Sequence, residues 1–348
     1  MNTKLIDNIE QFILEIPKAE LHLHLEGAIP LETLFDFIQK RGGEPSIKNL
    51  DDLRRKLNYT NFAHFIDLWV WKNTFIKEEK DFEEIAYQVL CNLSKQNVKY
   101  VEAHYAPGDY WRQGLSEQGI TECLIKGKQQ ARDDFGIGCE LILDICRDNG
   151  SEKGMERLNM LTPYLGKGLI GIGLGGSEQT FPADPYAYIY KEAKERGFRL
   201  TAHAGEAAGP ESIWAVIEKL GVERIGHGIR ANEDPQLVSL LKQRQIPLEI
   251  CVISNVRTGV CNSIEAHPIK QYFKQGLMVT VNSDDPVMFN TTISQEYLAL
   301  IEKLDFTIND LKRLSINGIK ASFMSDNDKK LMEDQFEKEW QHLINKYS

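Results

Sequence analysis

The sequence predicts an eight-stranded (β/α)8 barrel with a helical insertion after its first strand and further helices at its C-terminal end. Eight short apolar runs recur along the 348 residues, and amphipathic stretches with helical spacing separate them. Alternation of this kind is typical of a parallel sheet covered by helices. From the second run onward the runs begin about every 25 to 40 residues, which is the repeat that a β/α barrel needs.

The predicted strands are short runs rich in aliphatic residues, and most of them end in Gly, Asn, Asp or Pro. Such runs fit parallel strands, which are covered on both faces and therefore need apolar residues on both. The eight runs are residues 19–27, 98–107, 138–146, 169–178, 199–206, 224–231, 247–255 and 278–286. The alternative fold, an open doubly wound sheet, usually carries a phosphate loop. The glycines within residues 171–176 lack the spacing of that loop, so we interpret this segment as a tight turn at a strand end.

The interval between the first two strands is much longer than the others and predicts an insertion over about residues 30–97. Its segment NFAHFIDLWVWKNTF has a helical pattern, in which Phe62, Phe65 and Leu68 are helically spaced. These side chains would cover an apolar ligand, although simple packing of an insertion helix explains the pattern equally well. No linker divides the chain, so we expect residues 1–348 to form a single domain.

Composition restricts the class of function. The formal net charge of −10 argues against binding to phosphate backbones, so no nucleic acid partner is expected. The six cysteines are scattered, which is typical of reduced thiols in the cytoplasm. The N-terminus carries acids without a long apolar core, and no run approaches the length of a membrane-spanning helix. We therefore expect a cytoplasmic protein without a membrane partner, and composition gives no indication of an oligomeric state.

His22 and His24 lie two residues apart in the first predicted strand. The strand period of two directs both side chains to one face. If that face is the barrel interior, both imidazoles converge on one point. A pair of this kind also arises by chance, and on its own it favours ordinary hydrogen-bonded histidines.

Three later strands end in polar residues. His203 and Glu206 end the fifth run, His227 lies between two glycines in the sixth, and Asp284 and Asp285 are adjacent in the eighth. Each has a structural alternative: an acid at a helix N-terminus, a histidine bonded to a carbonyl, or an Asx turn. Because the C-terminal ends of barrel strands share one face, we expect these side chains to be neighbours.

Three histidines and one aspartate in this set provide nitrogen and oxygen ligands for a metal ion. Such a set suits zinc, with manganese, iron or cobalt as alternatives. The expected ligands are His22, His24, His203 and Asp284. A single ion with a free position can lower the pKa of a water towards neutrality. His227 and Glu206 are then the candidates to move protons, and Asp285 is a candidate acceptor for a substrate hydrogen bond.

Five motifs in the chain resemble those of the adenosine deaminase family of amidohydrolase barrels. They follow one another in the family's order, and similar motifs extend over most of the chain. The motifs are HLHLEGA (22–28), TAHAGE (201–206), RIGHG (224–228), SN-x-x-TG (254–259) and NSDDP (282–286). The resemblance implies hydrolytic removal of the 6-amino group of an adenine ring with one zinc ion per subunit. The expected partners are water and a purine nucleoside, either adenosine or 2′-deoxyadenosine. The products would be inosine or 2′-deoxyinosine, and ammonia, in purine salvage.

The resemblance also implies roles for individual residues. The four expected ligands would bind zinc, with Asp284 also acting in catalysis, and His227 would orient or deprotonate the activated water. Glu206 would protonate N1 of the purine, because C6 is a poor electrophile until N1 gains a proton. For this, burial should raise the pKa of Glu206. Asp285 would hydrogen-bond N7, and the N–H of Gly176 would reach N3.

Glu26 departs from the pattern, since many adenosine deaminases have an aspartate there, near the ribose 5′-hydroxyl. The longer side chain moves the carboxylate by about one C–C bond, which leaves the group on N9 open. The turn GLGGSE is similar to that of bacterial enzymes that include aminodeoxyfutalosine deaminases of menaquinone synthesis. Adenine deaminases share HLH-x-EG and NSDDP. Aminodeoxyfutalosine and adenine are therefore alternative substrates.

Two other classes of protein remain as alternatives. A polynucleotide deaminase requires a P-C-x-x-C motif, which this chain lacks. A non-catalytic protein that binds a nucleoside or a metal should have lost a ligand or the acid, and here all of them are present.

Overall fold

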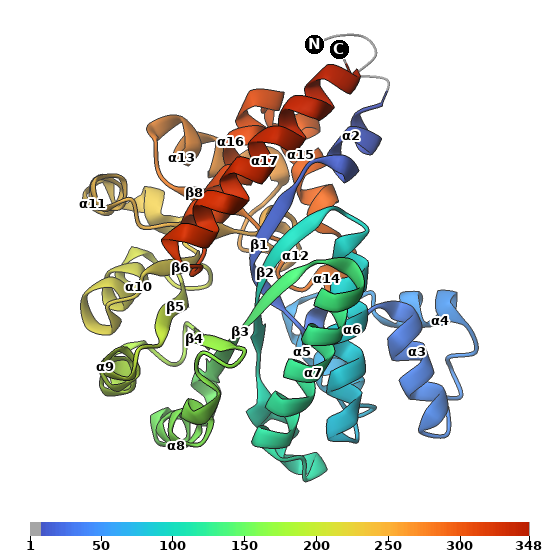
Figure 1. Cartoon of the computed structure of the whole chain (residues 1–348). Coiled ribbons are helices and arrows are strands. Elements are labelled where there is room, and N and C mark those ends of the chain that lie inside the picture. Colours follow the sequence, from blue (N-terminus) through green and yellow to red (C-terminus); the bar gives the residue numbers. More distant parts are fainter. Residues whose placement is uncertain (1–7, 348) are drawn as a thin grey trace.

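A computed structural model describes residues 8–347, although not the side chains of residues 62 and 63, and contains eight parallel strands that curl into a barrel (Figure 1). Each strand pairs with the next one along the chain, from β1 to β8. The strands are β1 (Lys18–His24), β2 (Val98–Tyr105), β3 (Gly138–Cys146), β4 (Leu169–Gly175), β5 (Arg199–Ala204), β6 (Arg224–His227), β7 (Leu248–Ile250) and β8 (Val279–Val281). The predicted (β/α)8 barrel is confirmed.

The barrel closes where β1 meets the segment that follows β8. The backbone N–H of His24 donates to the carbonyl of Asp284 at 2.9 Å, and the N–H of Asp284 donates to the carbonyl of His22 at 3.1 Å. The side chain of Asn282 accepts from the N–H of Leu21 at 2.8 Å. First and last strands are thus joined by hydrogen bonds, which we call the seam.

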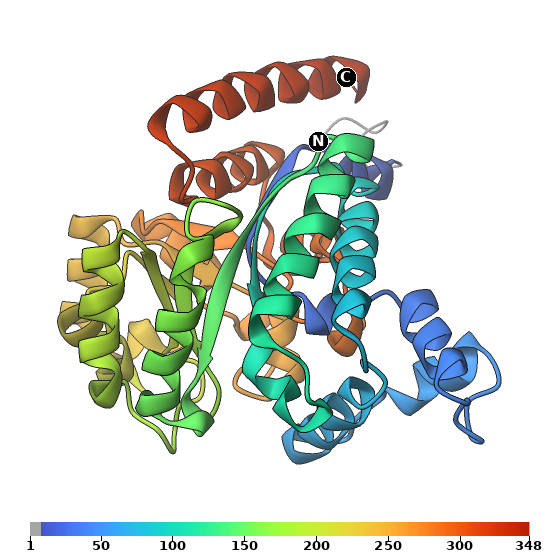
Figure 2. The same ribbon diagram turned by 60° about the horizontal axis from the view of Figure 1, so that its bottom comes forward.

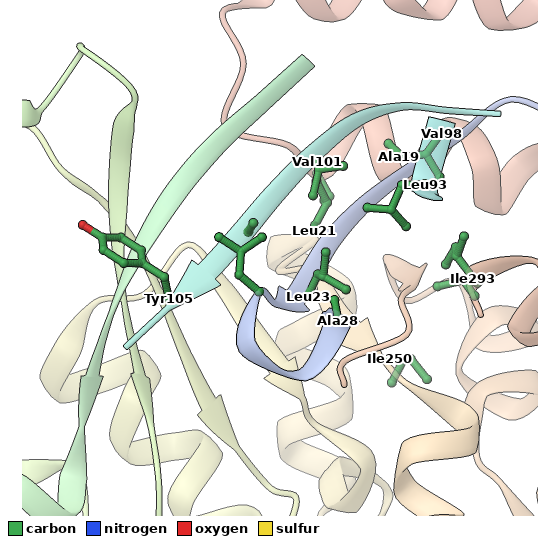
Figure 3. Packing of buried hydrophobic residues seen from close by; sticks show 14 of the residues in the cluster. Ala19, Leu21, Leu23, Ala28, Leu93, Val98, Val101, Tyr105, Ile250 and Ile293 are labelled. Carbon is green, nitrogen blue, oxygen red and sulfur yellow. The ribbon is translucent and has the colours of Figure 1, made fainter. Parts of the chain in front are cut away.

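Helices form the outer layer and bury the outward faces of the strands. In Figure 3, Leu21 and Leu23 of β1 and Val101 of β2 point away from the barrel axis into this layer. Each fully buried aliphatic side chain contributes about 1.5–3 kcal/mol. The helices between the strands include α6 (Glu79–Ser94), α7 (Glu117–Phe135), α8 (Ser151–Leu161), α9 (Ala187–Arg196), α10 (Pro210–Ala215), α11 (Pro235–Arg244) and α13 (Ile269–Gln275).

The inward faces of several strands are polar, which differs from the expectation of strands apolar on both faces. The inward positions carry buried charged and polar side chains in place of aliphatic ones. They include Glu20, His22, Glu102, His104, Thr201, His203, Arg224, Glu249 and Thr280. Because side chains alternate along a strand, this polar set coexists with the apolar outer set in the same short runs.

The chain between β1 and β2 is helical, as predicted for residues 30–97. It begins with the short turn η1 (Glu26–Ala28), and α3 (Leu31–Lys40), α4 (Leu50–Lys56) and α5 (Phe62–Asn73) precede α6. Asn49 and Asn61 cap α4 and α5 by accepting a backbone N–H, a common start signal for helices. In Figures 1 and 2, α3 and α4 project from the side of the barrel.

Helices also follow β8, as predicted: α14 (Pro286–Phe289), α15 (Ile293–Leu304), α16 (Ile308–Ala321) and α17 (Asp326–Tyr347). In Figure 2, α17 lies across one end of the barrel. It packs on α2 (Ile9–Glu15), where the ring of Phe12 lies 5.8 Å from that of Trp340. Within residues 8–347 no helix is long and apolar enough to span a membrane.

Seven of the eight predicted runs extend past the end of the observed strand, and only 138–146 matches; two runs show the reason most clearly. The run 224–231 is a strand only over β6, and η7 (Ile229–Glu233) follows it. The run 247–255 holds the three residues of β7 and then enters α12 (Val252–Arg257). A short apolar run fits a buried strand and a buried helix equally well, so hydrophobicity alone placed both ends wrongly.

Candidate metal centre and active site

Four side chains converge inside the barrel at the carboxyl ends of β1, β5 and β8. Nε2 of His24 lies 3.2 Å from Nε2 of His203 and 3.4 Å from Oδ1 of Asp284. Nε2 of His22 lies 3.5 Å from the same carboxylate oxygen. One ligand atom from each of the four lies within 4.8 Å of the others. The structure therefore brings together the four residues expected to bind a metal ion, which we call the metal cluster.

The hydrogen bonds of the metal cluster fit a cation. Among the described residues, nothing hydrogen-bonds Nε2 of His22, although this atom is buried. Its other ring nitrogen, Nδ1, lies 2.8 Å from Oε2 of Glu249, which directs the free lone pair of Nε2 towards Asp284. Three imidazole nitrogens and a carboxylate that face one another are a suitable donor set for zinc.

Buried charged side chains hold His22 of the metal cluster in its orientation. Oε1 of Glu249 accepts from Nε of Arg224 at 2.5 Å, and the same guanidinium pairs with Glu102. Burial raises the pKa of Glu249, but Arg224 and His22 outweigh this effect and hold it below the usual value. Gly226 leaves room for the arrangement, since a Cβ there would lie 2.8 Å from the ring of His22. Glu249 thus stays ionised and fixes the orientation of His22.

His227 and Asp284 have left-handed backbone conformations, with φ of 60° and 64°. For residues other than glycine this region costs of order 1–3 kcal/mol and is typical of functional sites. The turn at Asp284 directs its carboxylate into the barrel, where Oδ2 also accepts from Ser254 at 2.7 Å. Nε2 of His227 lies 4.0 Å from Oδ2 of Asp284 and 3.5 Å from Oε2 of Glu206.

A chain of hydrogen bonds sets the proton position on His227. The backbone N–H of Ile269 donates to Nδ1 of His267, so the proton of this neutral ring is on Nε2. That proton is donated to Oδ1 of Asn255 at 3.1 Å, which turns the amide nitrogen of Asn255 towards Nδ1 of His227 at 3.2 Å. Burial lowers the pKa of His227 to about 4. Neutral His227 therefore accepts at Nδ1 and presents an Nε2–H to the site.

Glu206 combines burial with a raised pKa. Its side chain is 20% exposed. Burial, followed by the charges of Asp284 and Glu178, raises its pKa to about 8. A carboxyl group with this pKa is protonated at neutral pH and can act as an acid. The rise expected from the sequence is present.

Glu178, in the turn after β4, holds the loop that carries Glu206. Its Oε1 accepts from the N–H of Gly205 at 2.6 Å. Its Oε2 accepts from the N–H groups of Glu206, Ala207 and Ala208 at 2.8–3.1 Å. Burial raises the pKa of Glu178, but the hydrogen bonds to its carboxylate outweigh this effect and hold the pKa below its usual value. Glu178 is therefore ionised. Four backbone donors on one carboxylate fix the position of Glu206.

Asp285 and Glu26 each follow a ligand of the metal cluster along the chain, Asp284 and His24. Gly27 touches Asp285 so closely that a Cβ there would lie 1.8 Å from Oδ1. This oxygen has no hydrogen-bond partner among the described residues. Oε1 of Glu26 accepts from the N–H of Ala106 at 3.0 Å, and burial raises the pKa of Glu26 to about 7. Lys72 of α5 is also buried, and the charges of Glu26 and Asp285 act on its ammonium group.

The remaining residues expected to contact the substrate are Gly176, Phe62 and Phe65. Gly176 follows β4 with a φ of 91°, in the predicted turn. Phe65 is buried and stacks on Phe289 at 5.3 Å, so packing of the insertion helix accounts for it. The side chain of Phe62 lies outside the described part of the chain. No contact with a substrate is tested for any of these residues.

The sequence did not reveal several residues of the site. His104 of β2 lies 5.0 Å from the ring of His22, and neither of its ring nitrogens has a partner among the described residues. Burial holds its pKa well below the usual value, so the ring is neutral. The alternation of Glu102 and His104 in the second run was a signal for an inward polar face. The other residues that sequence reasoning missed are Lys72, Asp144, Glu178, Glu249, Asn255 and His267.

Comparison with known proteins agrees with this geometry. A family model described as adenosine deaminase matches residues 17–339. The chain belongs to the adenosine deaminase family. Members of the adenosine deaminase family hydrolyse a C–N bond, and this chain is a hydrolase of the same kind.

Relatives within the adenosine deaminase family differ in their substrates. An adenine deaminase from Wolinella succinogenes is 34% identical over 92% of this chain and 97% of its own length. An adenosine deaminase from Clostridium kluyveri is 33% identical over 92% of this chain and 93% of its own length. The crystal structure of an adenine deaminase from Arthrobacter aurescens is 31% identical, covers 95% of this chain and 99% of its own, and has a TM-score of 0.88.

Proposed function

We propose that this protein hydrolyses adenine to hypoxanthine and ammonia. The observation that carries the proposal is the buried carboxylate of Glu26, which lies two residues after His24 of the metal cluster and is influenced by the charge of Lys72. A free base offers an N–H at its five-membered ring, which a carboxylate can accept, whereas a nucleoside carries a sugar there. The similarity to two adenine deaminases supports the same choice.

Adenosine, the substrate first expected from the sequence, is the second candidate. The similarity to the Clostridium kluyveri adenosine deaminase favours it. For adenosine, Glu26 would face the sugar in place of an N–H. Aminodeoxyfutalosine, which was the other alternative, carries a carboxylate that would meet the acids around Glu26.

We further propose that His22, His24, His203 and Asp284 hold one zinc ion per subunit. When bound, the ion lowers the pKa of a water and so supplies a nucleophile at neutral pH. The orphaned Nε2 of His22 and its bond to Glu249 support this assignment.

The remaining side chains would act on the substrate and the attacking water. Glu206, protonated at neutral pH, gives its proton to N1 and makes C6 electrophilic. Neutral His227 carries its proton on Nε2 and has no lone pair there. It would therefore orient the water by donating a hydrogen bond and would not remove a proton from it. Asp284 is the carboxylate beside that nitrogen and can accept the proton of the water. Burial, followed by the charge of Asp284, raises the pKa of Asp285 well above its usual value, so its protonated carboxyl group can donate to N7. The N–H of Gly176 would donate to N3.

A substrate panel with the zinc-loaded protein tests the proposal. The loss of the ultraviolet band of the 6-aminopurine is followed for adenine, adenosine, 2′-deoxyadenosine and aminodeoxyfutalosine. We expect kcat/KM for adenine to exceed that for adenosine by at least about 100-fold. A purine that lacks the N–H at N9 leaves the buried carboxylate of the site without a partner, and such a site discriminates strongly against it. A preference for adenosine would favour the second candidate. Activity that survives prolonged chelation would contradict the metal assignment.

The single-domain organisation of residues 1–348 and the cytoplasmic location stay predictions. They can be checked by the cooperativity of unfolding and by fractionation of cells that produce the protein.

A further inference from the structure

Lys72 is a buried cation at the end of α5, in the insertion. The residue is 1% exposed. Its Nζ lies 4.0 Å from the centroid of the Trp69 ring and donates to Oδ1 of Asn73 at 2.7 Å. Burial lowers the pKa of Lys72 to about 8, because a low dielectric disfavours the charged form. Buried ammonium groups with few partners are common at functional sites.

Three carboxylates from three strand ends act on this ammonium. Glu26 follows β1, Asp109 lies in η2 (Pro107–Gln113) after β2, and Asp285 follows β8; the charge of each favours protonated Lys72. Within the described part of the chain, no carboxylate forms a direct ion pair with Nζ, and Asn73 is its one hydrogen-bond acceptor. The ammonium therefore retains N–H donors for a ligand or water.

A carboxyl oxygen without a partner lies at the same site. Oδ1 of Asp285 is buried and receives no hydrogen bond from the described residues. It lies against Gly27, which follows Glu26 in the chain. In the proposed binding mode the carboxyl group of Asp285 donates its proton to N7, which has only a lone pair to offer, and N9 is the other nitrogen of the same five-membered ring. Glu26 and Lys72 would then be on the side of that nitrogen.

We propose that Lys72 is a specificity-determining residue, which together with Glu26 selects a purine with an unsubstituted N9. This inference deepens the proposed function and rests on it. The ammonium balances part of the carboxylate charge and holds Glu26 at the position where it accepts the N–H of the base. Since Asp285 is neutral when it donates to N7, two carboxylates, Glu26 and Asp109, act on one ammonium. A substrate with an anionic group on N9, such as a 5′-phosphate, therefore meets net repulsion. The arrangement suits a neutral base.

The test compares adenine with 9-methyladenine, which lacks the N–H, in the zinc-loaded wild type and in Lys72→Met. The ratio of their kcat/KM values does not depend on how much of a preparation is folded. We expect the wild type to prefer adenine by at least about 100-fold. In Lys72→Met the preference should fall at least about tenfold, through a higher KM for adenine with a much smaller change in kcat. Lys72→Arg keeps a cation with N–H donors and should restore most of the preference.

Lys56→Met is the matched control. Lys56 also lies over a tryptophan of the insertion, with Nζ 5.3 Å from the ring of Trp71, but its side chain is exposed. This variant should retain the wild-type preference.

Two results would overturn the inference. One is an unchanged preference in Lys72→Met while the wild type does deaminate adenine. The other is efficient turnover of AMP that Lys72→Met abolishes, which would make Lys72 an anion-binding residue. Failure of the proposed function is a separate result, since the wild type itself would then prefer adenosine or leave both purines unchanged.

Discussion

The amide nitrogen of Asn255 lies 3.2 Å from Nδ1 of His227, and this contact determines which ring nitrogen carries the proton. His267 fixes the amide from its other side, because it donates to Oδ1 of Asn255. The motif SN-x-x-TG therefore acts on the site without containing a ligand. His227 keeps an Nε2–H directed at the space beside Asp284.

Asn255→Asp tests this arrangement. An aspartate accepts only, so it would draw the His227 proton to Nδ1 and leave Nε2 as a lone pair. We expect kcat to fall about 10–100-fold with little change in KM, as for other residues that orient active-site groups. Steady-state kinetics with a zinc assay would measure this. Asn345→Asp, on the exposed surface of α17, is the control. An unchanged kcat would show that the proton position on His227 is irrelevant.

The raised pKa of Glu206 predicts a pH dependence. A carboxyl group with a pKa of about 8 is protonated below that pH and loses its proton above it. Because the protonated form donates to N1, kcat/KM should be constant up to about pH 8 and then fall about tenfold per pH unit. Glu206→Gln cannot donate a proton and should lower kcat by about 10²–10⁴-fold while it retains zinc. A pH profile that rises above pH 8 would assign the opposite protonation state to Glu206.

Glu178→Gln should change both the loop and the acid. The charge of Glu178 contributes to the raised pKa of Glu206, so its removal should move the alkaline fall of kcat/KM to lower pH. Loss of charged acceptors for backbone N–H groups should also lower the free energy of unfolding by about 1–3 kcal/mol. The matched variant is Glu211→Gln, which alters a carboxylate in the first turn of α10 that accepts from the N–H of Gly209. A purely structural role of Glu178 would leave the pH profile in place.

Glu249→Gln should weaken zinc binding about 10–100-fold, because a neutral amide holds Nδ1 of His22 less strongly than a carboxylate does. Competition with a chromophoric chelator measures the affinity. Glu223→Gln removes a surface carboxylate near β6 and should bind zinc as the wild type does. If both variants bind zinc equally well, Glu249 does not support zinc binding and only forms the ion pair with Arg224.

The sequence was sufficient for the residues whose direction follows from strand period. His22 and His24 share a face because side chains alternate, and barrel geometry then brings His203 and Asp284 to the same end. Glu178 and Asn255 could not be found in this way, because they act through loop backbone and side-chain amides whose positions depend on tertiary packing. Lys72 gives no signal in the sequence, because a lysine in a helical pattern is normally exposed. Only the fold reveals that the ends of β1, β2 and β8 surround it with acids.

The seam between the first and last strands has a consequence for biosynthesis. His22 and His24 leave the ribosome more than two hundred residues before Asp284, which reaches them only when the barrel closes. A nascent chain can therefore offer no complete set of ligands until the segment after β8 has been made. An ion can be bound by all four ligands only after the barrel has closed, and its bonds would then connect the first strand to the segment that follows the last one.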